Sequence, residues 1–271
     1  MELTQIWTLA RKEFRDRLRN RWVLAVALVF AVFSLVITYF GGAQQGQLGL
    51  RSVEFTISSL VSLVIYLIPL IALLLGFDAV VGERERGSLD LLLALPITRS
   101  ELLLGKYLGL ALALTLSTLS GFALVALLLF QQFGWAGLYH YLGFVFSSLL
   151  LGLAFLSLAV GLSVVVRERT RASGLAIAIW FLFVLVFDLL LLSLLVATGG
   201  SYGGDALAYL LLLNPADVFR ILNVFSLEDV RSFYGLTSIL PPSLAKPWLL
   251  GGVMLGWIVL PLALSNWRFK A

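Results

Sequence analysis

Long apolar runs fill most of the chain, and short charged segments separate them. The runs continue for about twenty residues without the polar–apolar alternation of a membrane β-strand, so they suit α-helices that cross about 30 Å of hydrocarbon. Helices also satisfy their own backbone hydrogen bonds inside lipid. The pattern predicts six transmembrane helices, at residues 22–40, 57–77, 102–130, 141–166, 173–197 and 249–267.

Composition supports this fold class. Apolar residues make up 61% of the 271 residues and charged residues 13%, and the mean hydropathy is +1.02, which lies far outside the range of soluble domains. The six spans leave little chain for a separate soluble domain. We expect an all-α integral membrane protein with a single domain over residues 1–271.

The distribution of Lys and Arg predicts the orientation in the membrane. With a cytoplasmic N-terminus, 15 of the 19 basic residues fall on the cytoplasmic side, as basic residues near span ends do. Both termini are therefore expected in the cytoplasm, in a bacterial inner membrane. The net charge of +4 is explained by this topology and does not indicate nucleic-acid binding.

The segment before the first span, within residues 1–21, has apolar residues at helical spacing. They are Leu3, Trp7, Ala10, Phe14 and Leu18, with basic residues between them. Such a pattern is typical of an amphipathic helix that lies in the headgroup plane of the bilayer. A solvated basic tail is the alternative.

A charged loop at residues 78–101 joins the second and third spans. Gly87 is expected to stop a helical turn and Ser88 to cap a short amphipathic helix, which Pro96 ends. Ser100 is a candidate cap of the third span, with Glu101 in its first turn. A docking helix and an ordinary solvated loop both fit this pattern. The candidate contact residues are Glu83, Arg84, Glu85, Arg86, Gly87, Ser88, Leu89, Pro96 and Arg99.

The loop contains E-R-E-x-G-[ST]-L, then L-x-x-P-[IL]-x-R, then G-K. It resembles the first cytoplasmic loop of ABC-2-type transporter permeases. In that family the loop carries the coupling helix, which sits in a groove of the ATP-binding subunit. The matching positions here are Glu83, Glu85, Gly87, Ser88, Leu89, Pro96, Arg99 and Lys106.

A narrower resemblance runs almost end to end. Its motifs are A-R-K-E from Ala10, L-R-N-R-W from Leu18, G-Q-L-G from Gly46, P-L-I-A-L-L-L from Pro69, W-F-L-F-V-L-V-F-D-L from Trp180 and L-L-L-N-P from Leu211. The chain resembles membrane subunits of the ABC systems that mature nitrous oxide reductase. The resemblance implies a homodimer, two cytoplasmic ATPase subunits that hold ATP and Mg²⁺, and a periplasmic β-helical partner. It also implies a role in assembling the copper-sulfide centre of nitrous oxide reductase, with copper from a chaperone lipoprotein.

The chain has few residues that could bind a metal ion or catalyse a reaction. It has no Cys, two Met and one His, so it lacks the soft ligands that a copper path needs. It also has no G-x-x-x-x-G-K-[ST] phosphate loop, no cluster of metal ligands and no nucleophile constellation. We therefore expect a non-catalytic subunit with no cofactor and no metal site. The apolar spans suit transmission of movement better than passage of ions.

Asp188 is the one carboxylate expected near the centre of a span, where it is costly unless paired, hydrated or protonated. A functional role and hydrogen bonding to a Ser, Thr or Trp of another span are both open. No basic residue at the same depth is expected to pair with it. Asp78, at the end of the second span, is expected to be solvated.

The segment at residues 198–246 is expected to face the periplasm, with a re-entrant or interfacial part near residues 206–213. Asn214 is expected to cap a helix with Pro215 at its first position and Asp217 in its first turn. The helix either meets a periplasmic partner or only lids the bundle. The candidate contact residues are Asn214, Pro215, Asp217, Arg220, Pro241 and Pro242.

Residues 131–140, between the third and fourth spans, are interpreted as a short loop with an aromatic interface belt, because they include Trp135 and Tyr139. Two further classes of function stay open. An ABC-2 exporter of a lipid, drug, polysaccharide or sulfur species would share the charged loop. A passive membrane anchor would tolerate substitutions in it.

Overall fold

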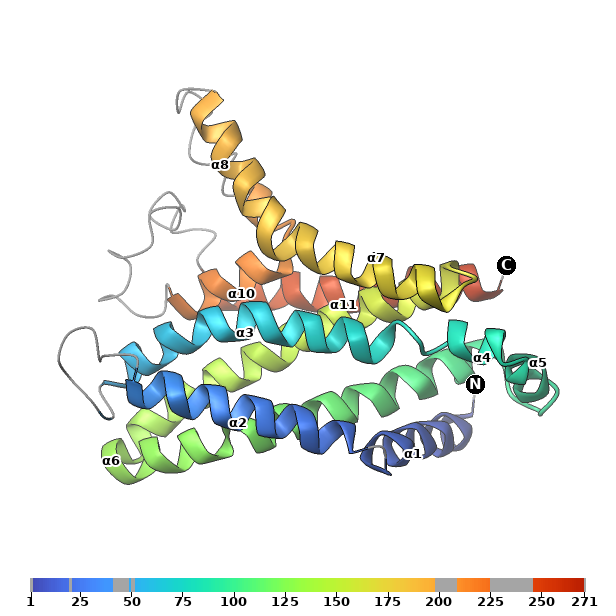
Figure 1. Cartoon of the computed structure of the whole chain (residues 1–271), viewed down its shortest axis with the longest axis horizontal. Coiled ribbons are helices and arrows are strands. Elements are labelled where there is room, and N and C mark those ends of the chain that lie inside the picture. The colour runs from blue at the N-terminus through green and yellow to red at the C-terminus, as the bar shows by residue number, and fades with distance from the viewer. Residues whose placement is uncertain are drawn as a thin grey trace.

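The computed structural model describes residues 2–19, 21–40, 49, 52–197, 209–224 and 246–270, and within these ranges every regular element is helical (Figure 1). The elements are α1 (Leu3–Arg19), α2 (Trp22–Phe40), α3 (Val53–Gly76), α4 (Val81–Glu85), α5 (Ser88–Leu93), α6 (Arg99–Val165), α7 (Arg169–Phe181), the π-helix η2 (Leu182–Val186), α8 (Phe187–Ala197), α10 (Pro215–Val224) and α11 (Pro247–Lys270). The all-α prediction is confirmed.

The 67-residue α6 is a hairpin of two helices that meet at Gly134. Gly134 has φ 64° and ψ −154°, a conformation that glycine adopts at little cost. The limbs, residues 99–133 and 135–165, run antiparallel: the Tyr107 hydroxyl donates to the Leu153 carbonyl (3.2 Å) and the Tyr141 hydroxyl to the Phe122 carbonyl (3.4 Å). The loop predicted at residues 131–140 is therefore wrong, because helix continues on both sides of one glycine.

Five helical stretches of the described chain are long and apolar enough to cross a membrane. They are Val23–Phe40, Val53–Glu85, Arg99–Val165, Arg169–Ala197 and Pro247–Phe269. The six predicted ranges lie within these stretches apart from Trp22 and Val166, each one residue beyond an end, and the third and fourth ranges lie on the two limbs of α6. The chain is thus a multi-pass helical membrane protein.

The α6 hairpin is the centre of the fold, because α1, α2, α3 and α11 all pack against it. Small residues allow close approach of these helices. A Cβ at Gly121 would lie 2.3 Å from the Cβ of Phe30 on α2, and one at Gly152 would lie 3.1 Å from Ile68 on α3. Aromatic rings fill the core beside these contacts, with Phe122 against Phe30 and Phe144.

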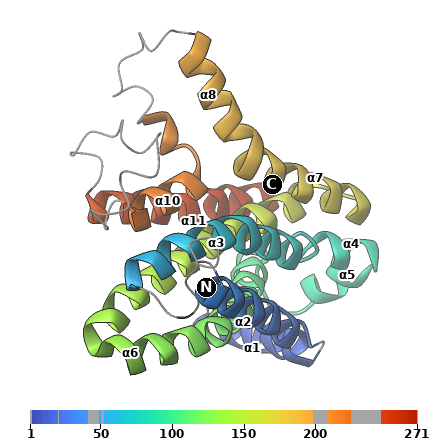
Figure 2. The ribbon, with the colours of Figure 1, turned by 60° about the vertical axis from the view of Figure 1, so that its left-hand side comes forward.

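The fifth predicted span bends at η2. The α7 part runs along the bundle, where the Trp180 indole donates to the Tyr66 carbonyl of α3 (2.9 Å). Beyond η2, α8 turns away from the other helices, as Figures 1 and 2 show. A π-helical turn inside an α-helix is a common cause of such a bend and is frequent at functional sites.

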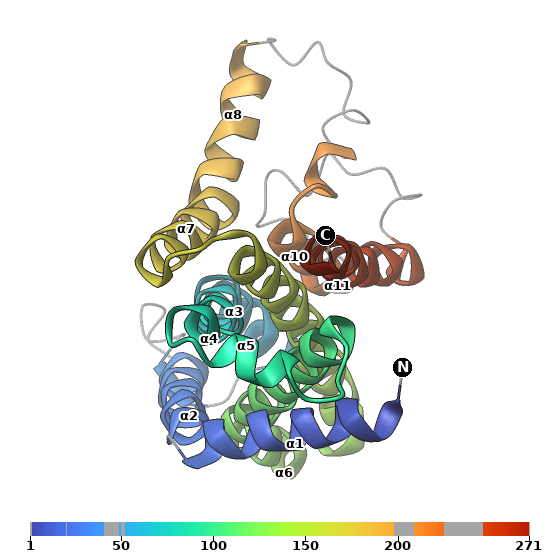
Figure 3. The ribbon, with the colours of Figure 1, turned by 90° about the vertical axis from the view of Figure 1, so that its right-hand side faces the viewer.

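At one end of the bundle α1, α4 and α5 gather beside the start of α6 and the C-terminal end of α11 (Figure 3). The predicted helix at the N-terminus is present as α1, but its apolar stripe is divided. Ile6 and Ala10 are buried, whereas Leu3, Trp7 and Leu18 are exposed. The position of α1 relative to a membrane surface stays a prediction.

We expect Gly121→Ala to destabilise the protein by about 1–3 kcal/mol, because the new methyl group would force Phe30 and α2 away from α6. The measurement is thermal unfolding in detergent, followed by tryptophan fluorescence. Gly174→Ala on α7 is the matched control: nothing lies within 4 Å of its Cβ position, so a helical alanine should stabilise it by about 0.5–1 kcal/mol. Equal stability of the two variants would contradict this packing.

Candidate coupling site

The charged loop folds as two short helices at an angle, α4 and α5, separated by Gly87. Gly87 has φ 70°, in the left-handed region that favours glycine. The predicted break at Gly87 is therefore confirmed. Ser88 does not cap α5 as predicted: its hydroxyl turns back and contacts the backbone carbonyl of Glu83 (3.2 Å) and the Glu83 carboxylate.

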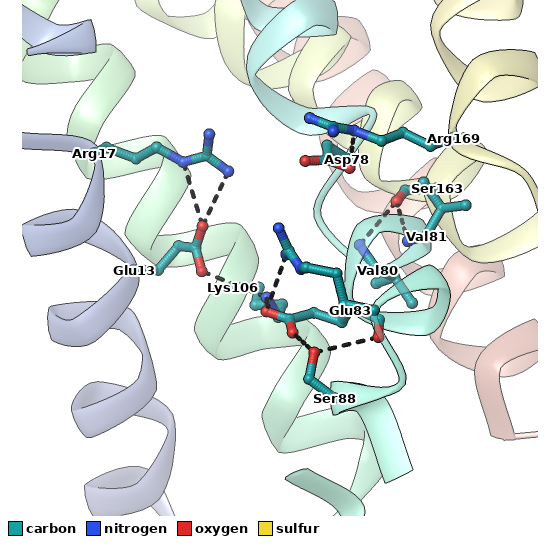
Figure 4. A network of polar contacts seen from close by, with 11 residues as sticks. Glu13, Arg17, Asp78, Val80, Val81, Glu83, Ser88, Lys106, Ser163 and Arg169 are labelled. Atoms are coloured by element: carbon teal, nitrogen blue, oxygen red, sulfur yellow. Dashed lines mark hydrogen bonds and ion pairs between the residues drawn. The ribbon is translucent and has the colours of Figure 1, made fainter. Parts of the chain in front are cut away.

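A buried lysine holds the loop against the bundle (Figure 4). Lys106, on the first limb of α6, has a side chain only 7% exposed, and its Nζ lies 3.1 Å from Glu83 Oε1 and 3.5 Å from Glu13 Oε2 on α1. Arg17 pairs with the other oxygen of Glu13 (3.1 Å), and Arg86 lies 3.8 Å from Glu83. Five charged groups from α1, the loop and α6 thus form one cluster.

Further bonds tie α4 to the far end of α6. The amides of Val80 and Val81 both donate to the Ser163 hydroxyl, at 2.8 and 3.0 Å. The guanidinium of Arg84 donates to the carbonyls of Val166 (2.9 Å) and Val164 (3.3 Å). The loop is therefore fixed to both limbs of the hairpin.

The start of α7 is bound to the same region. Glu85 accepts a hydrogen bond from the backbone amide of Arg169 (2.6 Å), and the Arg169 side chain pairs with Asp78 (2.9 Å). The expectation of a solvated Asp78 is wrong, since its side chain is only 15% exposed and ion-paired. A Cβ at Gly82 would lie 2.2 Å from the Asp78 carboxylate, so α4 approaches it closely.

The N-cap of α6 is two residues earlier than predicted. Thr98, not Ser100, is the cap: its hydroxyl accepts from the Glu101 amide while Glu101 accepts from the Thr98 amide (2.8 Å). This reciprocal arrangement is a capping box. Glu101 also accepts from the backbone amide of Glu2 (2.6 Å), which brings the beginning of α1 to the same point.

These contacts leave one face of α5 free in the single chain. Leu91 is 73% exposed and Leu95, just after α5, is 54% exposed, whereas Leu89 is buried. Arg86, Gly87 and Pro96 are also exposed. Leu91 was not among the candidate contact residues, although an apolar residue on the charged side of a short amphipathic helix was a visible signal of a docking face.

Most of the remaining predicted loop residues make contacts within the chain itself. Glu83, Arg84 and Glu85 bind other parts of the protein, as described above, and Arg99 donates to the Phe269 carbonyl at the end of α11 (2.9 Å). Contact of the predicted residues with an ATPase subunit stays a prediction.

A second charged cluster involves Asp188, and it corrects the expectation that no basic residue reaches this carboxylate. Arg220 of α10 lies 3.0 Å from Asp188 and 2.6 Å from Asp217. Asn214 donates to Asp217 (2.8 Å) and to the Phe183 carbonyl in η2 (2.7 Å). Arg220 was assigned to a periplasmic surface, but α10 folds back against α3, α6 and α11.

Asn214 caps α10 as predicted, because its side-chain oxygen accepts from the Ala216 amide (3.0 Å). The segment before the cap lies deep along the spans, since the Leu212 carbonyl accepts from Trp257 near the middle of α11 (3.2 Å). Asn214, Pro215 and Asp217 are buried in the single chain, and Pro241 and Pro242 lie outside the described residues. Contact of these residues with a periplasmic partner stays a prediction.

In the described ranges, no three His, Cys, Asp or Glu side chains come together as a metal site would require. The two charged clusters are instead built from ion pairs and hydrogen bonds, which join elements far apart in the sequence.

Comparison with known proteins agrees with the loop resemblance. The family described as ABC-2 family transporter protein matches residues 7–271. A protein of Stutzerimonas stutzeri named "Probable ABC transporter permease protein NosY" is 47% identical over 275 residues, which cover 99% of each chain. A protein of the same name from Pseudomonas aeruginosa is 47% identical over 271 residues, which cover 98% of each chain.

We expect Lys106→Met to destabilise the protein by about 3–5 kcal/mol, because it leaves the Glu13 and Glu83 carboxylates partly buried without their shared cation. Thermal unfolding in detergent measures the effect. Lys12→Met, at an exposed position on α1, should stay within about 0.5 kcal/mol of the unsubstituted protein. Adding Glu83→Gln to Lys106→Met should recover part of the loss. Equal stability of the two lysine variants would contradict a structural role for the cluster.

Arg220→Met is expected to cost about 3 kcal/mol and to cost more than Asp188→Asn, because only the arginine change strands two carboxylates. The comparison uses unfolding midpoints of the purified variants. Arg171→Met removes an exposed pair with Glu168 and should cost less than about 1 kcal/mol. The proposed geometry fails if Asp188→Asn is the more damaging change.

Proposed function

Since the chain belongs to the ABC-2 family of transporter proteins, and is a permease of an ABC transporter in the bacterial inner membrane, we propose that it transmits ATP-driven movement to a periplasmic partner. ATP and Mg²⁺ would be held by separate cytoplasmic ATPase subunits. The chain itself would be non-catalytic and would have no cofactor of its own.

The observation that carries this proposal is that α5 exposes an apolar face while the loop around it is bound to several other helices. Leu91 and Leu95 project from a loop that is fixed to α1, both limbs of α6 and α7. An apolar helix face that enters a groove on a partner is a common recognition mode. A push on α5 would therefore move several spans together and not only the loop.

We propose six spans with both termini in the cytoplasm. Each limb of α6 is longer than the ~20 residues that a span needs, so the hairpin counts as two spans. This topology places α1, α4 and α5 on the cytoplasmic side with most of the basic residues. It also lets the chain form a homodimer that receives two ATPase subunits.

The biological role that we propose is assembly of the copper-sulfide centre of nitrous oxide reductase. It rests on two supports: the near full-length similarity to proteins named NosY and the motifs shared with maturation systems. A periplasmic β-helical protein would receive the movement, and a chaperone lipoprotein would deliver copper. With no Cys and one His, the chain is poorly suited to carry copper itself.

Native mass spectrometry of the complex, purified in mild detergent from the native membrane, tests this role. The proposal expects two copies of this chain, two ATPase subunits and a periplasmic β-helical protein. An ATPase subunit without any periplasmic protein would instead support an exporter of a lipid, drug, polysaccharide or sulfur species. No ATPase subunit would support a passive anchor.

Leu91→Asp is expected to lower the amount of ATPase subunit that co-purifies by at least about tenfold, because it places a charge on the apolar docking face. The unfolding midpoint of the isolated chain should not change, since this side chain is exposed. Leu3→Asp, on an equally exposed leucine of α1, is the matched control and should retain the ATPase subunit. Retention by Leu91→Asp would contradict docking through α5.

A further inference from the structure

A pocket of about 430 Å³ lies between α5, the two ends of α6 and the end of α11. Four arginines from separate parts of the chain line it, together with a single carboxylate. These charged residues are Arg84, Arg99, Arg167, Arg268 and Asp90. The apolar residues that line it are Leu89, Leu93, Val164, Val165 and Phe269.

Two of the arginines are held in place by the backbone. Arg84 donates to the carbonyls of Val164 and Val166, and Arg99 donates to the Phe269 carbonyl while its guanidinium lies 5.9 Å from the Phe269 ring centre. Backbone carbonyls carry no formal charge, and within the described residues neither guanidinium has an ion-pair partner. Each guanidinium has five N–H donors, so donors remain for a ligand.

The other two arginines, Arg167 and Arg268, have neither an ion-pair partner nor a side-chain hydrogen bond within the described part of the chain. Both are exposed, so their substitution should not disturb the fold. Asp90 opposes only one of the four positive charges around the pocket. The pocket therefore has an excess of positive charge that an anion would neutralise.

The position of the pocket indicates what kind of anion fits. It lies where α6 and α11 end. In the proposed topology, on which this inference rests, that end is cytoplasmic and the arginines would lie at headgroup level. Arginine forks bind phosphate oxygens in pairs. Basic pockets between spans on the cytoplasmic side are typical sites for anionic headgroups. The apolar lining suits the glycerol and first methylenes of a lipid.

We propose that this pocket binds the phosphate group of an anionic phospholipid, and that the bound lipid joins α5 to the end of α11. Inorganic phosphate from solution offers the same chemistry and is the other source of such an anion. The site does not depend on the proposed role in enzyme maturation. Its occupancy would set how firmly α5 is held against the bundle.

The test uses the delipidated full-length protein in mild detergent and the double variant Arg167→Gln/Arg268→Gln. Phosphatidylglycerol, phosphatidylcholine and inorganic phosphate are the probes. The measurements are the unfolding midpoint and the number of lipids retained in native mass spectrometry. Arg15→Gln/Arg171→Gln loses the same charge at exposed positions outside the pocket and is the matched control.

We expect phosphatidylglycerol, but not phosphatidylcholine, to raise the midpoint of the unsubstituted protein and of the control. The pocket variant should need at least about tenfold more phosphatidylglycerol, as expected from the loss of two charge-assisted contacts. If inorganic phosphate alone gives the same arginine-dependent shift, the anion site is supported and its source is the solution.

Two results would overturn the proposal. One is an equal response of the pocket variant and the control to both phosphatidylglycerol and phosphate. The other is a pocket variant that binds lipid and phosphate normally but no longer retains the ATPase subunit, which would assign the arginines to that protein interface.

Discussion

The ion pairs of the buried Lys106 ammonium with two carboxylates are the interaction on which the proposed coupling depends. A lysine almost removed from water is costly unless carboxylates replace its hydration. Glu13 and Glu83 do so from two different elements, α1 and the loop. Loss of either carboxylate would leave the buried lysine with one anionic partner in place of two. The start of α6, the N-terminal helix and the loop therefore form one mechanical unit, and the exposed face of α5 projects from it.

The remaining polar contacts extend this unit along the fold. Arg84 and Ser163 connect the loop to the second limb of α6, and Arg169 connects it to α7. Halfway along the spans, Arg220 joins α8 to α10 beside the π-helical bend. Between these two charged regions the helices meet through aromatic and small apolar side chains. The arrangement thus has one cross-linked end, a second set of ion pairs near mid-span and a bend at η2, which suits transmission of movement.

The sequence predicted the features that depend on neighbouring residues. Apolar runs located the helical stretches that are long and apolar enough to cross a membrane, and the left-handed preference of glycine located the break at Gly87. Pairings between distant residues were missed, because Arg220 reaches Asp188 only once α10 folds back into the bundle. The choice of Thr98 over Ser100 as a cap was missed for a related reason: both have a hydroxyl, and only the position of Glu101 three residues after Thr98 distinguishes them. Leu91 was left out for a different reason: its place beside Asp90 in a short amphipathic helix was a visible signal that the choice of candidate contacts did not use.

Pulsed electron–electron double resonance between spin labels at positions 8 and 94 measures whether α1 and the charged loop move as one unit. The chain has no native Cys, so Thr8→Cys and Ala94→Cys label only these exposed sites of α1 and of the turn after α5. In the complex with its ATPase subunits, we expect the intrachain distance between the two labels to be the same with and without ATP. A distance that changes with ATP would show that the loop moves independently of α1 and would contradict the coupled unit.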